Sequence, residues 1–376
     1  MRPQGIALFR KPFARECTLL AGDVETLGSV CDLDGRSGFV VAPFAVDDNL
    51  PVVLMHPVRC EVFGVEEVTS KGVEEAFGMC GARADDNLAD ARQGVKGKSL
   101  SESMAPATVC HPARVSPSEN DYPFEVFHDR LMDGGFQKLV LSRSSQCPLP
   151  KDFSSVACFR KACESYPRLF IALVYTPQTG LWLTATPEVL LDGMGHDWQT
   201  MALAGTMKCT SFPEDPPVAA WSDKNIQEQR LVASYMSRCL QRVADDFTEN
   251  GPYTVRAAHL VHLRSDFSFS LPETKHLGRL LAMLHPTPAV CGLPKEEARD
   301  FILAHEPCSR RYYSGFMGML EPEGHTFLYV SLRCMQISAT VCRLYAGGGL
   351  LKDSRRESEW DETETKMETM RRLLNV

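Results

Sequence analysis

The chain has 376 residues, of which 44% are hydrophobic and 23% are charged, and its formal net charge is −8. This composition is that of a globular chain with enough apolar residues for a large core, and it argues against a mainly disordered chain. The negative charge argues against nucleic-acid binding, because no basic surplus is present to neutralise phosphates.

The 14 cysteines are scattered without C-x-x-C spacing, so they do not predict a zinc site. The first twenty residues lack the apolar core of a signal peptide, and no stretch of eighteen residues is apolar throughout. We therefore expect a cytoplasmic protein with reduced thiols and without a membrane partner.

Short strand-like runs occupy the first 80 residues, for example at 38–41 and 52–55. Residues 82–120 are polar and contain several serines and prolines, which predicts a long surface connection or insert. A helix is predicted to follow, starting near residues 116–119 and ending at the glycines of 134–135.

Strand signals in the central region are short apolar runs at 138–143, 169–175, 181–185 and 198–203. Residues 225–246 carry apolar side chains along one stripe and predict a long amphipathic helix. Farther along, residues 327–337 and 341–345 form the best hairpin candidate, and residues 357–374 predict a closing helix.

The predicted strands arrive in runs and do not alternate strictly with helices. This order favours an α+β fold with antiparallel sheets over a doubly wound parallel sheet. The glycine run at 347–349 lacks G-x-G-x-x-G spacing and lies near the end of the chain, so we do not expect a dinucleotide site.

Carboxylates crowd the start of the closing helix, directly after the glycine run 347–349. Glu359 and Glu362 are three residues apart and share one helical face. Two carboxylates beside a turn of exposed backbone N–H groups can hold a hard divalent cation next to an anionic ligand. The alternative is a solvated helix start, in which acidic residues favour the helix N-terminus and Glu362 pairs with Lys366.

The most specific segment is LHPTPAVCGLPK at 284–295. Its composition alone would indicate a proline-rich turn between helices. It stands, however, in a series of motifs that also includes residues 138–143, 186–188, 202–206 and 359–362. With these motifs, residues 120–374 resemble the chorismate-utilising enzymes, a family that includes anthranilate and salicylate synthases, and within it they are most similar to the isochorismate synthases.

The resemblance implies an α+β fold of two packed, largely antiparallel β-sheets with helices on the outside. Residues 1–115 would form a divergent N-terminal part of the β scaffold, and residues 116–376 would form the chorismate-binding catalytic region. We expect one structural domain, because two packed sheets need more strands than the second region readily supplies.

Single positions indicate the branch of the family that the chain resembles. Lys138 stands where ammonia-using relatives usually carry glutamine. Ala204 stands where the aminodeoxychorismate branch places a nucleophilic lysine, and Pro-Ala-Val at 288–290 is similar to the water-using branch. The resemblance therefore favours water as the nucleophile.

The activity implied is a reversible isomerisation of chorismate to isochorismate that depends on Mg²⁺ and on no organic cofactor. Water adds at C2, the C4 hydroxyl leaves, and the product feeds menaquinone or siderophore biosynthesis. One alternative is salicylate synthase, which also eliminates pyruvate. The other is an inactive chorismate-binding homologue, which would be expected to lack a catalytic or metal-binding residue. Chorismate would be the partner, and we expect a monomer.

Two residues match the catalytic positions of the family. Lys138 would be the base that activates water, which requires a lowered pKa through desolvation or a neighbouring positive charge. Glu188 follows Thr186-Pro187 and would be the general acid, which requires a raised pKa in a partly apolar pocket. The alternatives are a solvent-facing lysine at a strand edge and a surface glutamate in a turn.

Three residues match the Mg²⁺ ligands of the family, namely Glu228, Glu359 and Glu362. Many relatives have histidine after the first of these, where this chain has Gln229. Mg²⁺ prefers oxygen ligands, and it would bridge these acidic helices to a substrate carboxylate that they would otherwise repel.

The residues expected to bind substrate are Gly205, Thr206, His262, Tyr313, Arg333, Gly348 and Gly349. Arg333, predicted on a strand at 330–334, would grip a carboxylate with its planar fork, and Tyr313 would hydrogen-bond the same group. The backbone of Gly348 and Gly349 would approach the ligand closely. For Tyr313 a core position is the alternative. For His262 and His285 the default is a buried, hydrogen-bonded histidine, and His285 would fix a turn.

Overall fold

The structure is a computed structural model that describes residues 3–68, 71–79, 122–208 and 220–374. Within these ranges, sixteen strands form one continuous sheet, and every pairing between them is antiparallel. In their order across the sheet the strands are β10 (Phe247–Ala257), β11 (Leu260–Ser270), β9 (Asp197–Lys208), β8 (Val189–Met194), β14 (Thr326–Val330), β13 (Phe316–Leu320), β3 (Gly38–Ala42), β4 (Val52–Gly64), β2 (Glu16–Leu27), β1 (Gly5–Arg10), β6 (Phe170–Thr176), β7 (Gly180–Thr186), β15 (Cys334–Ile337), β16 (Val341–Leu350), β5 (Lys138–Pro148) and β12 (Gly292–Leu293).

The sheet folds over, so that its two halves pack face to face. Phe170 of β6 stacks on Tyr329 of β14 with ring centroids 4.3 Å apart, although five strands separate β6 from β14 across the sheet. Phe9 of β1 and Phe327 of β14 also meet, at 5.5 Å. These aromatic contacts belong to one buried apolar cluster between the halves. The predicted α+β fold with packed antiparallel layers is confirmed, and the two layers are joined into a single ladder.

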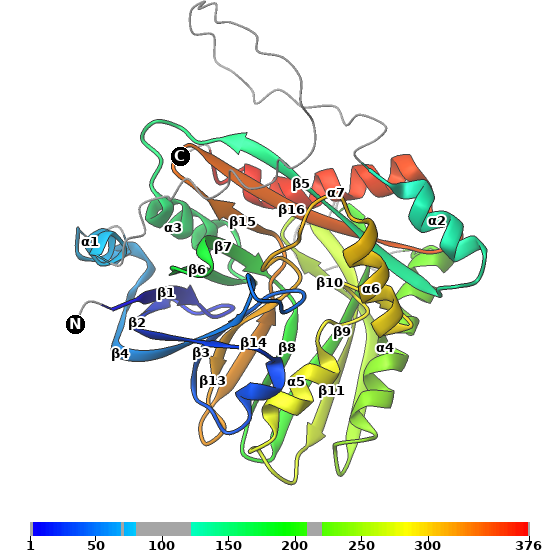
Figure 1. The fold of residues 1–376 in the computed structure, drawn as a ribbon, viewed down its shortest axis with the longest axis horizontal. Helices are drawn as coiled ribbons and strands as arrows, with labels where there is room; N and C mark the ends of the chain where they lie inside the picture. Colours follow the sequence, from blue (N-terminus) through cyan, green and yellow to red (C-terminus); the bar gives the residue numbers. More distant parts are fainter. Residues whose placement is uncertain (1–2, 69–70, 80–121, 209–219, 375–376) are drawn as a thin grey trace, which may run out of the picture.

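Helices cover the outer faces of the folded sheet (Figure 1). On one side, a buried apolar cluster joins α1 (Lys71–Met79), α3 (Ser155–Ser165) and α7 (Arg356–Arg371) to the sheet. The opposite face is covered by α4 (Asp223–Leu240) and α5 (Leu277–Leu284). A fourth cluster packs α2 (Phe124–Met132) and α6 (Lys295–His305) against β5. Two short 3₁₀ helices, η1 (Val30–Leu33) and η2 (Val65–Glu67), lie in connections.

The N-terminal strands lie in the middle of the sheet. β3, β4, β2 and β1 separate β13 from β6, so residues up to 68 complete the ladder in which the later motifs sit. The polar stretch predicted at 82–120 and the helix start predicted at 116–119 lie outside the described residues. Among the described residues, no helix is both long and apolar enough to cross a membrane.

Most predicted strands are observed, but the long amphipathic helix ends earlier than expected. Helix α4 stops at Leu240 and not near residue 246. The next turn tightens, since Val243 N–H bonds to the Leu240 carbonyl in a three-residue step. Asp245 then bonds to Ser270 at the end of β11, so pairing with the sheet replaces helix continuation.

The predicted strand at 327–337 is wrong as a single element. It is two strands, β14 and β15, separated by residues 331–333. β14 pairs with β13 and β8, whereas β15 pairs with β7 and β16, so the chain crosses from one half of the sheet to the other at this point. Arg333 lies in the crossing with φ of 47°, and not on a strand as predicted. The predicted hairpin is therefore formed by β15 and β16 alone.

Candidate active site

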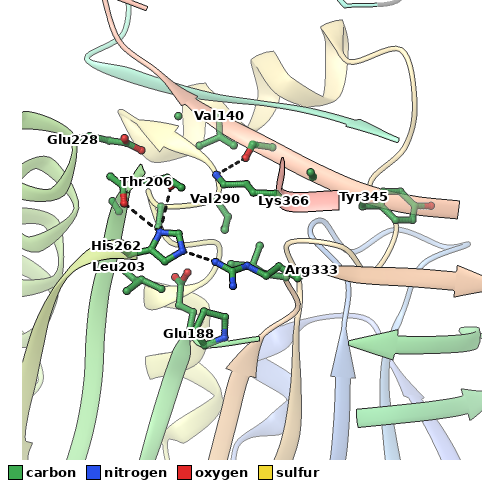
Figure 2. A pocket seen from close by; sticks show the side chains of 18 of the residues that line it. Val140, Glu188, Leu203, Thr206, Glu228, His262, Val290, Arg333, Tyr345 and Lys366 are labelled. Carbon is green, nitrogen blue, oxygen red and sulfur yellow. Dashed lines mark hydrogen bonds between the residues drawn. The ribbon is translucent and has the colours of Figure 1, made fainter. Parts of the chain in front are cut away.

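One pocket gathers residues from both halves of the sheet, at the crossing between β14 and β15 (Figure 2). Eight of the twelve site residues predicted from the sequence line it: Glu188, Gly205, Thr206, Glu228, His262, Tyr313, Arg333 and Gly349. Lys138, Gly348, Glu359 and Glu362 are not among its lining residues.

Glu188 is a buried carboxyl group at the corner between β7 and β8. Its backbone is fixed on both sides, because its N–H donates to the Thr186 hydroxyl at 3.2 Å and its carbonyl accepts from Val330 N–H at 2.9 Å. The Thr287 hydroxyl, from the 284–295 segment, donates to Oε1 at 3.4 Å. Burial raises the pKa of Glu188 to about 7, against the opposing effect of Lys138. The carboxyl group therefore holds a proton in the range where a general acid is needed.

Arg333 is a buried cation that faces Glu188 across the pocket (Figure 2). Its guanidinium donates to the Ala257 carbonyl at 3.0 Å and to Nε2 of His262. Burial lowers its pKa to about 10, so the group stays charged at neutral pH. None of the ion pairs in the described part of the chain includes Arg333. A buried guanidinium with this geometry suits an anionic ligand, preferably a carboxylate.

His262 is neutral and orients Arg333. Burial, with the positive charges of Arg333 and Lys366, lowers the pKa of His262 well below its usual value. Its Nδ1 lies 3.2 Å from the Gly205 carbonyl and 3.3 Å from the Thr206 hydroxyl. Because a carbonyl can only accept, the proton is on Nδ1, and the lone pair of Nε2 points at the guanidinium. His262 is therefore buried and hydrogen-bonded, and it also lines the pocket.

Gly205 forms a bulge that shapes this wall. In the ladder, His262 is opposite Thr206 and Leu263 is opposite Ala204, so Gly205 is one extra residue in β9. Its φ is 73°, a left-handed conformation that favours glycine. The bulge turns the Gly205 carbonyl toward His262, which an unbroken ladder would not do.

Lys366 is a pocket residue that the sequence interpretation used only as a helix-surface partner. Its Nζ donates to the Gly347 carbonyl at 2.9 Å (Figure 2). The same nitrogen pairs with Glu362 at 2.7 Å. It lines the pocket with Gly347 and gives it a second cation besides Arg333. The sequence spacing could have indicated this position. Lys366 lies four residues after Glu362 and seven after Glu359, so it shares their helical face.

The glycine run lies in strand β16, so the predicted turn is wrong. Ser142 and Val140 of β5 donate their N–H groups to partners on the side away from β16, each at 2.7 Å. In an antiparallel pair, the residues opposite them, Gly347 and Gly349, must then direct their peptide groups away from β5. Both glycines line the pocket, which is thus bordered by a free strand edge.

Gly348 has the other orientation. An added Cβ at Gly348 would lie 3.0 Å from Oε2 of Glu359, on the side of α7. An added Cβ at Gly349 would lie only 2.0 Å from Oε1 of Glu228, on the pocket side. The lack of side chains in the run therefore lets two carboxylates approach one strand from its two faces.

Lys138 lies just behind the pocket. It is fully buried on β5, and its Nζ is 3.0 Å from Oε1 of Glu228, which lines the pocket. Burial opposes ionisation of Glu228, but the positive charges of Lys138 and Lys224 outweigh it and lower the pKa of this carboxyl group. The alternative of a solvent-facing lysine at position 138 is therefore wrong.

The three predicted metal ligands are each paired with a lysine: Glu228 with Lys138, Glu359 with Lys224, and Glu362 with Lys366. Within the described ranges, no group of three potential ligands is arranged as a formed metal site. Oε2 of Glu359 is nevertheless buried without a hydrogen-bond partner. Burial and the nearby Glu362 raise the pKa of Glu359. A buried oxygen without a partner, near the second carboxylate of Glu362, fits a hard cation that takes oxygen ligands.

His285, by contrast, lies away from the pocket. Its Nε2 contacts the Pro43 carbonyl at 2.9 Å, and burial lowers its pKa to about 3. It therefore fixes the start of the 284–295 segment, as expected.

Comparison with known proteins gives a consistent picture. A family model described as chorismate binding enzyme matches residues 83–375. The isochorismate synthase DhbC of Bacillus subtilis is 32% identical over 260 residues, which are 66% of this chain and 65% of that protein. The isochorismate synthase MenF of Escherichia coli is 31% identical over 252 residues, 65% of this chain and 58% of that protein. The matched region is thus less than two-thirds of the length of either relative.

Solved structures share the fold over almost the whole chain. The structure of MenF, the menaquinone-specific isochorismate synthase from Escherichia coli, superimposes with a TM-score of 0.74 at 23% identity, covering 100% of this chain and 90% of that one. Anthranilate synthase component I from Streptococcus pneumoniae gives a TM-score of 0.66 at 16% identity, with 98% and 92% covered.

Proposed function

This chain belongs to the family of chorismate binding enzymes, and from that premise we infer that its pocket converts chorismate reversibly to isochorismate. In this isomerisation water adds at C2 and the C4 hydroxyl leaves, so one water is taken up and one is released. The observation that carries the proposal is the pairing, in one pocket, of Glu188, whose pKa is about 7, with the cations Arg333 and Lys366.

The charges of the pocket suit a small dianion. Chorismate carries two carboxylates, and the pocket offers the Arg333 guanidinium, the Lys366 ammonium and the free edge of β16. We assign one carboxylate to Arg333. The Tyr313 hydroxyl lies on the side of Gly347, where an added Cβ would be 3.0 Å from it. Lys366 and the N–H groups of Gly347 and Gly349 form the other anion-binding wall.

The proposed acid, Glu188, lines the pocket, and the proposed base, Lys138, lies just behind it. Glu188 gives its proton to the departing C4 hydroxyl, which leaves as water. Lys138 removes a proton from the attacking water. Nζ of Lys138 lies 3.0 Å from Oε1 of Glu228, so this carboxylate would orient the proposed base.

We propose Mg²⁺ as the cofactor, held by Glu228, Glu359 and Glu362. The bound cation would neutralise these carboxylates and accept a substrate carboxylate beside them. The buried, unpartnered Oε2 of Glu359 supports this assignment. The lysines that now pair with the three glutamates supply the positive charge that keeps these carboxylates together.

The proposal also includes the oligomeric state of the enzyme, its compartment and the use of its product. All residues assigned to the reaction lie in this chain, so the proposal requires no second subunit, and we propose a monomer. The eight buried free thiols among the described cysteines support a reducing, cytoplasmic compartment. We propose that the product feeds menaquinone or siderophore synthesis, and the relatives DhbC and MenF do not rank one use above the other.

The proposal is tested by incubating the purified chain with chorismate and Mg²⁺ and separating the products by chromatography, with and without a chelator. We expect an equilibrium mixture of chorismate and isochorismate that is not formed when the metal is removed. Salicylate with pyruvate would assign the salicylate synthase activity instead. Absence of turnover by a folded, Mg²⁺-supplied protein would leave an inactive chorismate-binding homologue.

A further inference from the structure

Arg310 is a buried arginine that contacts three pocket-lining segments through their backbones. It lies in the connection between α6 and β13, and its side chain is only 2% exposed. Its Nη1 donates to the Val290 carbonyl at 2.6 Å, and its Nη2 donates to the Val140 carbonyl at 2.8 Å. Its own carbonyl accepts from the N–H of Tyr313 at 2.9 Å. Val140, Val290 and Tyr313 all line the pocket, whereas Arg310 does not.

Glu306 orients this arginine and anchors it to β5. Its carboxylate accepts from Nε and Nη2 of Arg310 at 2.8 and 2.6 Å. The same carboxylate accepts from the backbone N–H and the hydroxyl of Ser142 at 2.7 and 2.9 Å. The Phe44 ring closes the other side, with the guanidinium 4.3 Å from its centroid. All the strong contacts of the pair are thus made to fixed groups inside the protein.

The segments joined by Arg310 lead to the proposed acid and the proposed base. Lys138 lies two residues before Val140 on β5 and is paired in register with Leu293 of β12. Thr287, three residues before Val290, donates to the carboxyl group of Glu188. Apart from the Arg310 contacts, β5 and the 287–291 segment are joined by the hydrogen bond from Val140 N–H to the Cys291 carbonyl, at 2.7 Å.

We propose that Arg310, held by Glu306, is a positioning residue that sets the separation of Lys138 and Glu188. It does so by fixing β5 against the 287–291 segment. The planar fork of arginine can bond two carbonyls and a carboxylate at once, whereas the compact ammonium of lysine cannot span them. The inference rests on the proposed function, because the separation matters only if these two residues act as base and acid.

The test compares Arg310→Lys with Arg10→Lys. Arg10 is a matched control, since it is 2% exposed and donates to the carbonyls of Pro167, Tyr166 and Leu169 at 2.7–2.9 Å, away from the pocket. Both variants are assayed with chorismate and Mg²⁺ at a temperature at which circular dichroism shows them fully folded.

We expect Arg310→Lys to lower kcat by about 10²-fold while KM changes much less, because ångström-scale misplacement of catalytic groups costs about that factor. Arg10→Lys should keep kcat within about 2-fold of the wild type, because it affects stability through packing away from the pocket. An Arg310→Lys variant that is folded and as active as Arg10→Lys would overturn the proposal. Failure of the wild-type chain to turn over chorismate would instead overturn the proposed function.

A milder variant keeps the test decisive if Arg310→Lys does not fold. Ser142→Ala removes only the hydroxyl contact to Glu306 and leaves the guanidinium contacts in place. We expect a several-fold loss of kcat with KM retained, and an unchanged kcat would count against the positioning role.

Discussion

At the scale of single residues, burial sets the charges of the pocket. It raises the pKa of Glu188 to about 7 and lowers that of Arg333 to about 10. Desolvation disfavours the charged form in both cases, but the two residues start from opposite ends of the pH scale. At neutral pH the pocket therefore contains a proton donor and a permanent cation.

Glu188 makes activity depend on pH in a defined direction. The acid form acts, so kcat should fall as pH rises through about 7. Glu188→Gln should lower kcat by roughly 10²–10⁴-fold, the usual contribution of a general acid. Rates measured from pH 5 to 9 check both points, with the exposed Glu323→Gln as the control. A Glu188→Gln variant with wild-type kcat would assign the acid to another group.

The same carboxyl group affects stability. Unfolded, it loses its proton near pH 4.3, but folded it keeps the proton to about pH 7. The folded state thus binds more protons between these values, and its stability contribution is present below pH 4.3 and lost as pH rises to 7. The change is on the order of 3 kcal/mol. Urea unfolding of Glu188→Gln should show a flatter dependence on pH over this window.

Arg333 should determine substrate affinity more than rate. Arg333→Lys keeps the charge but loses the fork, and charge-assisted hydrogen bonds contribute about 1.5–3 kcal/mol each. We therefore expect KM for chorismate to rise by about 10- to 100-fold. Initial rates over a range of chorismate concentrations measure this, with the half-exposed Arg36→Lys as control. An unchanged KM would mean that the guanidinium does not contact the substrate.

At the scale of elements, local irregularities build the site. The crossing between β14 and β15 places Arg333, the bulge in β9 turns the Gly205 carbonyl to His262, and the free edge of β16 forms one wall. Positive φ values occur at Gly205, Ser314 and Arg333, all at or beside the pocket. Such conformations persist at functional sites because the surrounding packing enforces them.

Comparison of Gly205 with Gly195 distinguishes the effect of backbone strain from the effect of a steric contact. Gly205 and Gly195 have φ values of 73° and 60°, but an added Cβ would meet Asn225 of α4 at 3.1 Å only at Gly205. Alanine should cost about 1–2 kcal/mol at either site, because both are left-handed. Only Gly205→Ala should also reduce kcat/KM, by displacing α4 or the pocket wall. Unfolding curves and kinetics of both variants decide this, and equal kinetics would exclude the contact.

At the scale of the whole molecule, the sheet is continuous through the N-terminal strands. β3, β4, β2 and β1 separate β13 from β6, and their inner side chains fill the cluster between the halves. The proposed catalytic region is therefore bound to the first 68 residues by hydrogen bonds and by apolar packing.

A fragment of residues 116–376 should fail to fold on its own. Removing the first strands would leave β13 and β6 with unpaired edges and would expose the aromatic cluster between the halves. Circular dichroism and thermal unfolding of the fragment, compared with the full chain, measure this. A cooperative transition near the melting temperature of the full chain would show that the catalytic region is an independent domain.

Sequence patterns by themselves determined the family, the α+β class and most strands, because alternating apolar runs and ordered motifs are local properties. They also identified Glu188, Arg333 and six other pocket residues, since each lies in a recognisable motif. They did not show that residues 327–337 cross between sheet halves, or that the glycine run is a strand edge, because strand partners are set by distant residues.

Only the tertiary structure decided which charges meet. Lys366 reaches the pocket because α7 packs along β16, and Arg310 bonds to Val140, which lies 170 residues earlier in the chain. No spacing rule can predict such contacts, since they depend on how the sheet folds over and on which groups are removed from water. The pKa of Glu188 follows from the same burial, so the chemistry of the pocket is a property of the fold and not of any single motif.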